Sequence, residues 1–208
     1  TTNIQCGSGG TAVNIDLNTC NQVYIQQANL TIDQSLSGKT IYSGAKVTVT
    51  GSTTNTNVIS NTLEINLDGN NITGGTFFST SSSSTSSPPT NKVYVKSNAT
   101  LGSATNPVLL ITKGYTLFDS NGGPDIYGLV YTSSNTIDVN GNIVFKGSFI
   151  ESSTATMTFG GNASIQFNMS VLENLKTNLG STGTSLKSPT CASLMLSGSI
   201  SGTKMTVY

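Results

Sequence analysis

The sequence predicts an all-β fold of the β-solenoid class, in which the chain winds into stacked coils that pair with one another. Three observations predict it. Short runs rich in Val, Ile, Tyr and Thr recur between Gly, Asn and Ser residues, several of them alternate apolar with polar positions, and part of the pattern returns at a fixed interval. A β-sandwich, which has a turn about every 8 to 12 residues, is the alternative that these runs also allow.

The recurring runs are the predicted strands. Alternation of apolar and polar residues lets a strand bury one face and leave the other in solvent. The runs that precede the repeat are residues 23–25, 30–32, 40–42, 46–49, 62–67 and 93–95. Helical spacing is almost absent from this part of the chain, so we expect it to be built from strands and turns.

The fixed interval is about 19 to 20 residues long and is clearest in the third quarter of the chain. The repeated positions are Leu110, Leu129 and Ser148, then Gly128 and Gly147, and then the segments 137–142 and 157–162. An interval of this length holds two or three short strands with tight turns, which is one rung of a solenoid. We therefore predict a single solenoid domain over residues 1–208. The phenylalanines expected in its core are Phe145, Phe149, Phe159 and Phe167.

Two segments interrupt the strand pattern. Residues 79–90 are all Ser, Thr or Pro, with no apolar side chain to offset the entropy of ordering them, so we predict a mobile loop. Residues 170–180 carry apolar side chains at helical spacing. Ser170 as N-cap, Glu173 in the first turn and Gly180 at the end predict a short α-helix, which caps the open end or the flank of the solenoid.

The composition argues against an enzyme. The chain has neither His nor Arg, so it lacks the base of a Ser-His or Cys-His pair and a bidentate clamp for phosphate. Only 9% of residues are charged, and the acidic residues do not cluster into the facing carboxylate pair that glycoside hydrolysis needs. Asp138, for example, aligns with Thr158 in the next rung. We therefore expect no catalytic residue and no cofactor, with a carboxylate-based polysaccharide enzyme as the alternative.

Charge and hydropathy restrict the expected partners. The formal net charge is +0, and the basic residues, all of them Lys, are scattered along the chain. Because affinity for nucleic acid comes largely from neutralising phosphates, we expect no nucleic-acid partner. No run approaches the roughly 20 apolar residues that span a bilayer. We expect an ectodomain, with any export signal or membrane anchor upstream of Thr1.

The three cysteines, Cys6, Cys20 and Cys191, allow at most one intramolecular disulfide. A bridge between Cys6 and Cys20 would close a loop of about 15 residues and stabilise the fold by roughly 3 kcal/mol. Cys191 could instead pair with either of the other two and tie the chain ends together. We predict the pair Cys6 and Cys20, and a disulfide of either kind implies an oxidising, extracellular location.

The tyrosines are the candidate ligand-binding residues. Those that we assign to a ligand site are Tyr42, Tyr94, Tyr115, Tyr127 and Tyr131, which lie on or beside predicted strands. If rungs stack about 4.8 Å apart, some of these rings align into a flat outer stripe that suits stacking on sugar rings. Packing in the core or at its rim is the alternative for each of them.

A metal site has only weak candidates in Asp119, Asn121 and Asp125, whose side chains carry the oxygen ligands that calcium takes. The segment lacks the terminal bidentate Glu of an EF-hand loop, and a turn rich in Asn and Gly needs no metal. We therefore expect no metal.

Glycine-punctuated rungs followed by a short helix also resemble a known family. The segments that carry the resemblance are residues 127–131, 137–142, 147–150, 160–167 and 171–175. They resemble the C-terminal region of PilX-like, type IV pilus-associated proteins, in which rungs with the motifs G-L-V-Y and N-G-N precede a V-L-x-x-L helix. More distantly, the chain is similar to the tāpirins, β-helical adhesins that bind cellulose.

The resemblance implies a minor-pilin-like surface protein, whose N-terminal hydrophobic helix, expected upstream of Thr1, would insert into the pilus filament. We therefore expect an extracellular, non-catalytic adhesion module whose partners are pilus filament subunits and a polysaccharide or other surface polymer. A pilus-independent, cellulose-binding adhesin is the main alternative. A DNA-uptake receptor is a further one.

Overall fold

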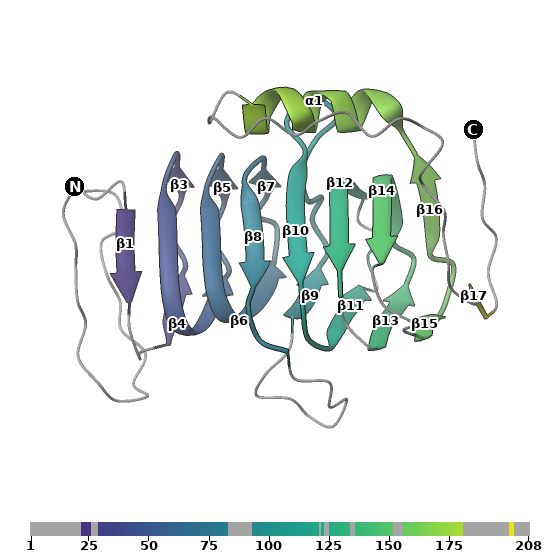
Figure 1. The fold of residues 1–208 in the computed structure, drawn as a ribbon, viewed down its shortest axis with the longest axis horizontal. Helices are drawn as coiled ribbons and strands as arrows, with labels where there is room; N and C mark the ends of the chain where they lie inside the picture. Colours follow the sequence, from purple (N-terminus) through teal and green to yellow (C-terminus); the bar gives the residue numbers. More distant parts are fainter. Residues whose placement is uncertain are drawn as a thin grey trace.

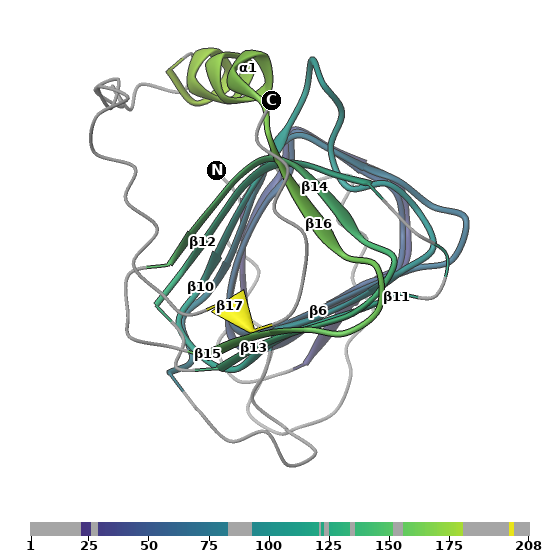
Figure 2. The same cartoon turned by 90° about the vertical axis from the view of Figure 1, so that its right-hand side faces the viewer.

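The described part of the chain forms a β-solenoid of about six turns with one α-helix along its side, as the repeat predicts, and a β-sandwich is excluded (Figure 1). The structure is a computed structural model. It describes residues 22–25, 29–82, 93–120, 122, 125–133, 136–151, 156–180 and 200–201. Viewed along the solenoid axis, the rungs have a triangular outline, so the molecule presents three strand faces (Figure 2).

We name the three faces A, B and C in the order in which each rung runs through them. Face A consists of β1 (Gln22–Ile25), the start of β4 (Thr40–Val49), the start of β6 (Asn57–Leu67), β8 (Thr76–Ser79), β10 (Val108–Thr112), the end of β12 (Asp125–Thr132) and the end of β14 (Val144–Glu151). Face B consists of β2 (Leu30–Ile32), the ends of β4 and β6, β9 (Val93–Ser97), β11 (Thr116–Ser120), β13 (Thr136–Gly141), β15 (Thr156–Phe159) and β17 (Ile200–Ser201). Face C consists of β3 (Leu36–Ser37), β5 (Thr53–Thr54), β7 (Ile72–Thr73), the starts of β12 and β14, and β16 (Ser164–Phe167).

Every strand pairing is parallel, so equivalent residues of successive rungs stand directly beside one another. The predicted matches of Gly128 with Gly147 and of Asp138 with Thr158 are confirmed. The predicted match of Leu110 with Leu129 is wrong by one residue, because Leu110 pairs with Val130. The rung from Leu110 to Val130 is 20 residues long and the rung from Val130 to Phe149 is 19 residues long, a difference that a fixed interval does not predict.

The core is a continuous stack of inward-facing apolar side chains. In the C-terminal rungs, Phe118 of face B, Phe145 of face C and Phe149 of face A meet edge to face, with ring centroids of Phe145 at 5.1 Å from Phe118 and 5.3 Å from Phe149. Burial of Phe145 and Phe149 confirms their prediction as core residues. Phe159 is partly buried against the core. The prediction for Phe167 is wrong in part, because this last residue of β16 is only half-buried.

The corner between faces C and A depends on glycine. Gly128 and Gly147 stack there with φ of +149° and +146°, a backbone conformation that residues with a side chain rarely adopt. A Cβ at Gly128 would lie 1.9 Å from the carbonyl oxygen of Val108, and one at Gly147 would lie 2.0 Å from the carbonyl oxygen of Gly128. The rungs of β12 and β14 can therefore approach to hydrogen-bonding distance at this corner because neither Gly128 nor Gly147 has a side chain.

The predicted loop 79–90 begins later than its composition indicates. Ser79 belongs to β8 and is buried, and its hydroxyl donates to the carbonyl oxygen of Asn61. Thr80 and Ser81 extend the ladder, since their amides donate to the carbonyl oxygens of Ser60 and Asn61. Small hydroxyl side chains fit the inside of this corner, where Ser60 and Ser79 are paired and buried. Residues 83–90 lie outside the described part of the chain, as do Cys6, Cys20 and Cys191, so the disulfide stays a prediction.

The predicted helix is confirmed as α1 (Met169–Gly180), and it covers the flank of the solenoid. It runs along the axis beside the corner between faces C and A, above the N-terminal end of β10 and in contact with β12 and β14, and it buries Val171 and Leu175 (Figures 1 and 2). The predicted N-cap is wrong, because Asn168 Oδ1, and not Ser170, accepts the amide of Val171 at 3.3 Å. Ser170 lies inside the first turn.

Far along the helix, two asparagine side chains join α1 to an earlier turn. Asn174 Nδ2 donates to the carbonyl oxygen of Ala104 at 2.8 Å, and Asn178 Nδ2 donates to Asn106 Oδ1 at 3.1 Å. The helix that leaves the last rung is therefore pinned to the turn before β10.

We expect Gly128→Ala to lower the free energy of unfolding by on the order of 3 kcal/mol, because the added Cβ meets the Val108 carbonyl. Gly69→Ala is the matched control, since Gly69 also has a positive φ, of +73°, but no atom within 4 Å of the added Cβ. Strain alone should cost about 1 kcal/mol there. Urea unfolding followed by circular dichroism measures both, and equal losses would contradict the close approach at the corner.

Candidate functional site

The outward side chains of faces B and C are mainly polar. On face B the outward column consists of Thr31, Thr48, Glu64, Tyr94, Leu117, Asp138 and Thr158. On face C the outward residues include Ser37, Thr54, Thr73, Tyr127, Lys146 and Gln166. Two faces therefore show the hydroxyl-rich, charged surface expected of a strand side in water.

Face A differs, because one of its outward columns is apolar in every described rung from β4 to β14. This outer column consists of Tyr42, Ile59, Phe78, Ile111, Tyr131 and Ile150. Tyr24 of β1 is next in register before Tyr42. Aromatic and isoleucine residues alternate strictly along the six positions, so an aromatic ring recurs on every second rung.

The outer column forms a narrow apolar line parallel to the solenoid axis. Neighbouring rungs lie about 4.8 Å apart, so consecutive rings lie about 10 Å apart. Tyr131 is 36% exposed, and the other five residues are half-buried. Six apolar side chains in one line on one face make an accessible surface that the folding of the rungs does not require.

Polar side chains border most of the outer column, but in β10 and β12 the neighbouring outward residues on the side of the corner between faces C and A are Leu109 and Leu129. The residues two positions earlier in the first three of these strands are Thr40, Asn57 and Thr76, and the residues at the following corner are Asn61, Thr80 and Lys113. Asn57 joins its neighbours, since its Nδ2 donates to Thr40 Oγ1 at 3.4 Å and its Oδ1 accepts the amide of Thr76 at 3.0 Å. Lys113 Nζ lies 5.6 Å above the ring of Phe78.

The predicted tyrosines are distributed over all three faces. Tyr42 and Tyr131 lie in the outer column, whereas Tyr94 lies on face B and Tyr127 on face C. Tyr115 is only 5% exposed, so its ring offers almost no surface to a ligand. The tyrosines alone therefore do not make one stripe.

The stripe that exists is completed by Phe78 and three isoleucines, which the sequence reasoning did not select. These residues take the same place in successive rungs, two positions before the corner between faces A and B. The sequence alone does not show where these corners fall, because they differ in length.

Two of the tyrosines bind carboxylates on face B. The hydroxyl of Tyr115 donates to Asp138 Oδ2 at 2.7 Å, and that of Tyr94 donates to Asp119 Oδ2 at 3.2 Å. Burial and then the hydrogen bond to Asp138 raise the pKa of Tyr115 to about 12. Burial and then the charge of Asp119 also raise the pKa of Tyr94. Both phenols therefore stay protonated and serve as donors between neighbouring rungs.

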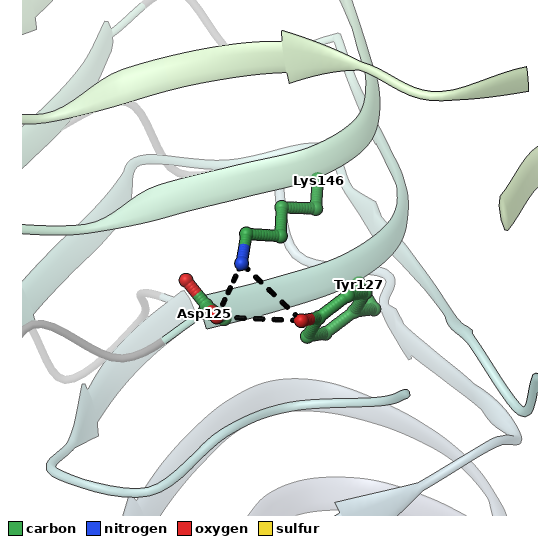
Figure 3. Close-up of polar contacts among 3 residues, drawn as sticks. All are labelled: Asp125, Tyr127 and Lys146. Atoms are coloured by element: carbon green, nitrogen blue, oxygen red, sulfur yellow. Dashed lines mark hydrogen bonds and ion pairs between the residues drawn. The ribbon is translucent and has the colours of Figure 1, made fainter. Parts of the chain in front are cut away.

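A second polar cluster lies on face C (Figure 3). Lys146 Nζ lies 2.6 Å from Asp125 Oδ2 and 3.2 Å from the hydroxyl of Tyr127, and it lies 5.0 Å above the Tyr127 ring. The hydrogen bond to Asp125 raises the pKa of Lys146. The ammonium therefore stays charged and unsuited to act as a base or a nucleophile.

The metal candidates are not gathered into one site in the part of the chain that the structure describes. Asp119 accepts the hydroxyl of Tyr94, and Asp125 pairs with Lys146. Asn121 is outside the described residues. Across the described ranges, no group of three or more Cys, Asp or Glu side chains is placed to hold a metal ion.

Fold and surface together define the class of this protein as a triangular β-solenoid with one apolar outer column and a helix along its flank. No protein-family model, curated protein or solved structure matches the chain. The resemblance to PilX-like proteins therefore stays a prediction. Among the described helical residues, none forms a helix long and apolar enough to cross a membrane.

We expect the fold to lose stability between pH 10 and pH 12 as Tyr115 ionises, since its folded pKa of about 12 lies above its ordinary value of 10.0. The stabilisation is complete below pH 10 and is lost as the pH rises through 12. Tyr115→Phe should cost about 1 kcal/mol at neutral pH and should weaken this alkaline loss. Urea midpoints measured across the pH range for both proteins test it, and parallel curves would contradict the role of this phenol.

Proposed function

We propose that this protein is a non-catalytic, extracellular binding module that attaches to a polymer or surface through the outer column of face A. The observation that carries the proposal is the contrast between faces. Equivalent outward positions are mostly polar on faces B and C but apolar in six successive described rungs of face A. Contiguous apolar surface on a folded protein is typical of interaction sites.

The rigid backbone favours this use of the outer column. Each strand of face A is hydrogen-bonded to its neighbours, so the six side chains are held in line before any ligand arrives. Prior ordering lowers the entropy cost of binding. A long, flat, preformed line suits an extended polymer better than a compact small molecule, which would need a concave pocket.

The chemistry of the polar clusters supports a role without catalysis. The carboxylates of Asp119, Asp125 and Asp138 each accept a hydrogen bond from a tyrosine hydroxyl or from Lys146. Lys146 is held in its charged form. General acid-base work needs groups with a pKa near the working pH, and these donors have a pKa above their ordinary values.

The proposed location on a type IV pilus rests on the resemblance to PilX-like proteins. A pilus-associated protein would carry the solenoid outward from the filament, with face A free to meet a surface. A pilus-independent, polysaccharide-binding adhesin is the second candidate, and the outer column serves it equally. A DNA receptor is less favoured, because Lys113 is the one basic side chain among the described residues that border the column.

Binding to insoluble polymers tests the outer column. We expect the protein to sediment with a polysaccharide such as cellulose or chitin, and we expect Phe78→Ser or Tyr131→Ser to lower its affinity by about tenfold, since each removes one stacking ring. Leu117→Ser is the matched control, because Leu117 is a half-buried outward residue of face B. Circular dichroism should show all variants folded. Absence of wild-type binding to every polymer tested, or equal losses in the control, would contradict the proposal.

Immunolabelling tests the place of display. Antibodies against the protein should label type IV filaments sheared from the cells that make it, since the proposed protein is a filament-associated subunit. Labelling of the cell envelope with bare filaments would contradict the pilus assignment and favour the pilus-independent adhesin.

A further inference from the structure

We infer that the outer column binds a neutral, extended β-1,4-linked polysaccharide chain that lies along the solenoid axis, with one aromatic ring for every second sugar. The inference rests on the proposed function and specifies its ligand. It follows from the order of side chains along the outer column, from the polar residues that border it, and from the charge of this surface.

The order of side chains gives a repeat of two rungs. Tyr42, Phe78 and Tyr131 stand on alternate rungs, and isoleucines stand between them. The parallel pairing fixes this spacing at about 10 Å, because the strands cannot slip along the axis without breaking their hydrogen bonds. A ligand that contacts every ring must therefore present the same apolar face at the same repeat.

A β-1,4-linked glycan has such a repeat. Successive sugars are turned by about half a revolution, so the chain is straight, and every second sugar presents the same face at a distance close to that between two rings. The C–H groups on a sugar ring face pack on aromatic rings, and the sugars between them can rest on the flat isoleucine side chains. Coiled α-linked glycans would contact one or two rings and then curve away.

The polar border supplies partners for the hydroxyls at the edges of such a chain. Thr40, Asn57 and Thr76 lie along one side of the column, and Asn61 and Thr80 lie along the other. The side chain of Asn57 is already oriented by its bonds to Thr40 and Thr76. Hydroxyl and amide groups that are fixed beside a narrow apolar line match a ribbon that is apolar on its faces and polar at its edges.

The charge of the surface favours a neutral glycan. Lys113, above the ring of Phe78, is the one charged side chain among the described residues named here for the column and its border. One ammonium offers hydrogen-bond donors to sugar hydroxyls, whereas an acidic polysaccharide would be expected to meet a row of Lys side chains. The apolar line is one residue wide from β4 to β8 and two residues wide at β10 and β12, where Leu109 and Leu129 adjoin it, so it is much narrower than the broad apolar centre typical of a dimer interface.

Titration with soluble cello- and chito-oligosaccharides of two to eight sugars, followed by calorimetry on the whole chain, tests the inference. We expect affinity to rise with each added pair of sugars and to level off at about six, where the ligand spans the six positions of the column from Tyr42 to Ile150 at the rung spacing. The six-sugar ligand should bind at least about tenfold more tightly than the disaccharide. An α-1,4-linked oligosaccharide of equal length should bind no better than the disaccharide.

A variant that moves one ring by one rung tests the two-rung repeat. The double change Ile111→Tyr with Tyr131→Ile keeps the composition of the column but places two rings on adjacent rungs. We expect it to lower affinity for the six-sugar ligand by about tenfold. Tyr131→Phe is the matched control, because it keeps a ring at every second rung, and its affinity should stay within about threefold of wild type.

The possible results separate this inference from the proposed function. Two results would overturn the inference that the glycan lies along the axis with one ring for every second sugar. One is an affinity that does not depend on oligosaccharide length, and the other is wild-type affinity in the double variant Ile111→Tyr with Tyr131→Ile. If Phe78→Ser still abolished polymer sedimentation in that case, the proposed function would stand with a different ligand. Concentration-dependent dimerisation that is lost in Phe78→Ser, with no oligosaccharide binding, would overturn the inference in favour of a second copy as the occupant.

Discussion

Parallel hydrogen bonding between successive rungs fixes the place of every side chain in this molecule. Because each strand pairs in register with the next, equivalent residues stand about 4.8 Å apart on all three faces. Inside, this constraint stacks apolar side chains into one core, in which Phe118, Phe145 and Phe149 meet from three directions. On the outside, the same pairing places residues of one type into a straight column whenever that type recurs once in each rung. The outer column of face A needs no further scaffold.

The corners show how the chain satisfies this constraint with rungs of unequal length. Leu63 pairs with Val93 across the long connection after β8, although most other rungs close over much shorter stretches. The extra residues fall between β8 and β9 in the sequence, and both strands still pair with β6. At the opposite corner, Gly128 and Gly147 let the backbones of two rungs approach closely. Insertions and glycines at the corners thus accommodate the differences in rung length, and the strand pairing on the faces stays regular.

The class of fold could be predicted from the sequence, because apolar-polar alternation marks the strands and the repeated glycines mark the length of a rung. Gly128 aligned with Gly147, and the helix was found by its apolar spacing, since both signals are local. The N-cap was placed two residues late, because Ser170 and Asn168 are both good caps and only the hydrogen bond to Val171 distinguishes them.

The sequence predicts only part of the candidate site, because it does not show which apolar residues face outward. The sequence predicts five tyrosines as ligand-binding residues, and Tyr42 and Tyr131 do lie in the outer column, but Tyr115 is buried and Tyr94 and Tyr127 lie on other faces. Phe78 and the isoleucines were overlooked, because nothing in their identity separates an outward from an inward apolar residue. That separation needs the register, and the register depends on corner lengths that the sequence does not display.

Helix α1 gives the molecule a property that a bare stack of rungs would lack. A solenoid pulled from its last rung can peel away one coil at a time, since each coil holds only its neighbours. Here Asn174 and Asn178 fasten the segment after β16 to the turn at Ala104 and Asn106. Tension applied through that segment is therefore shared with coils near the middle of the stack, so several must yield together. A module that clings to a surface under flow would gain resistance to shear from this strap.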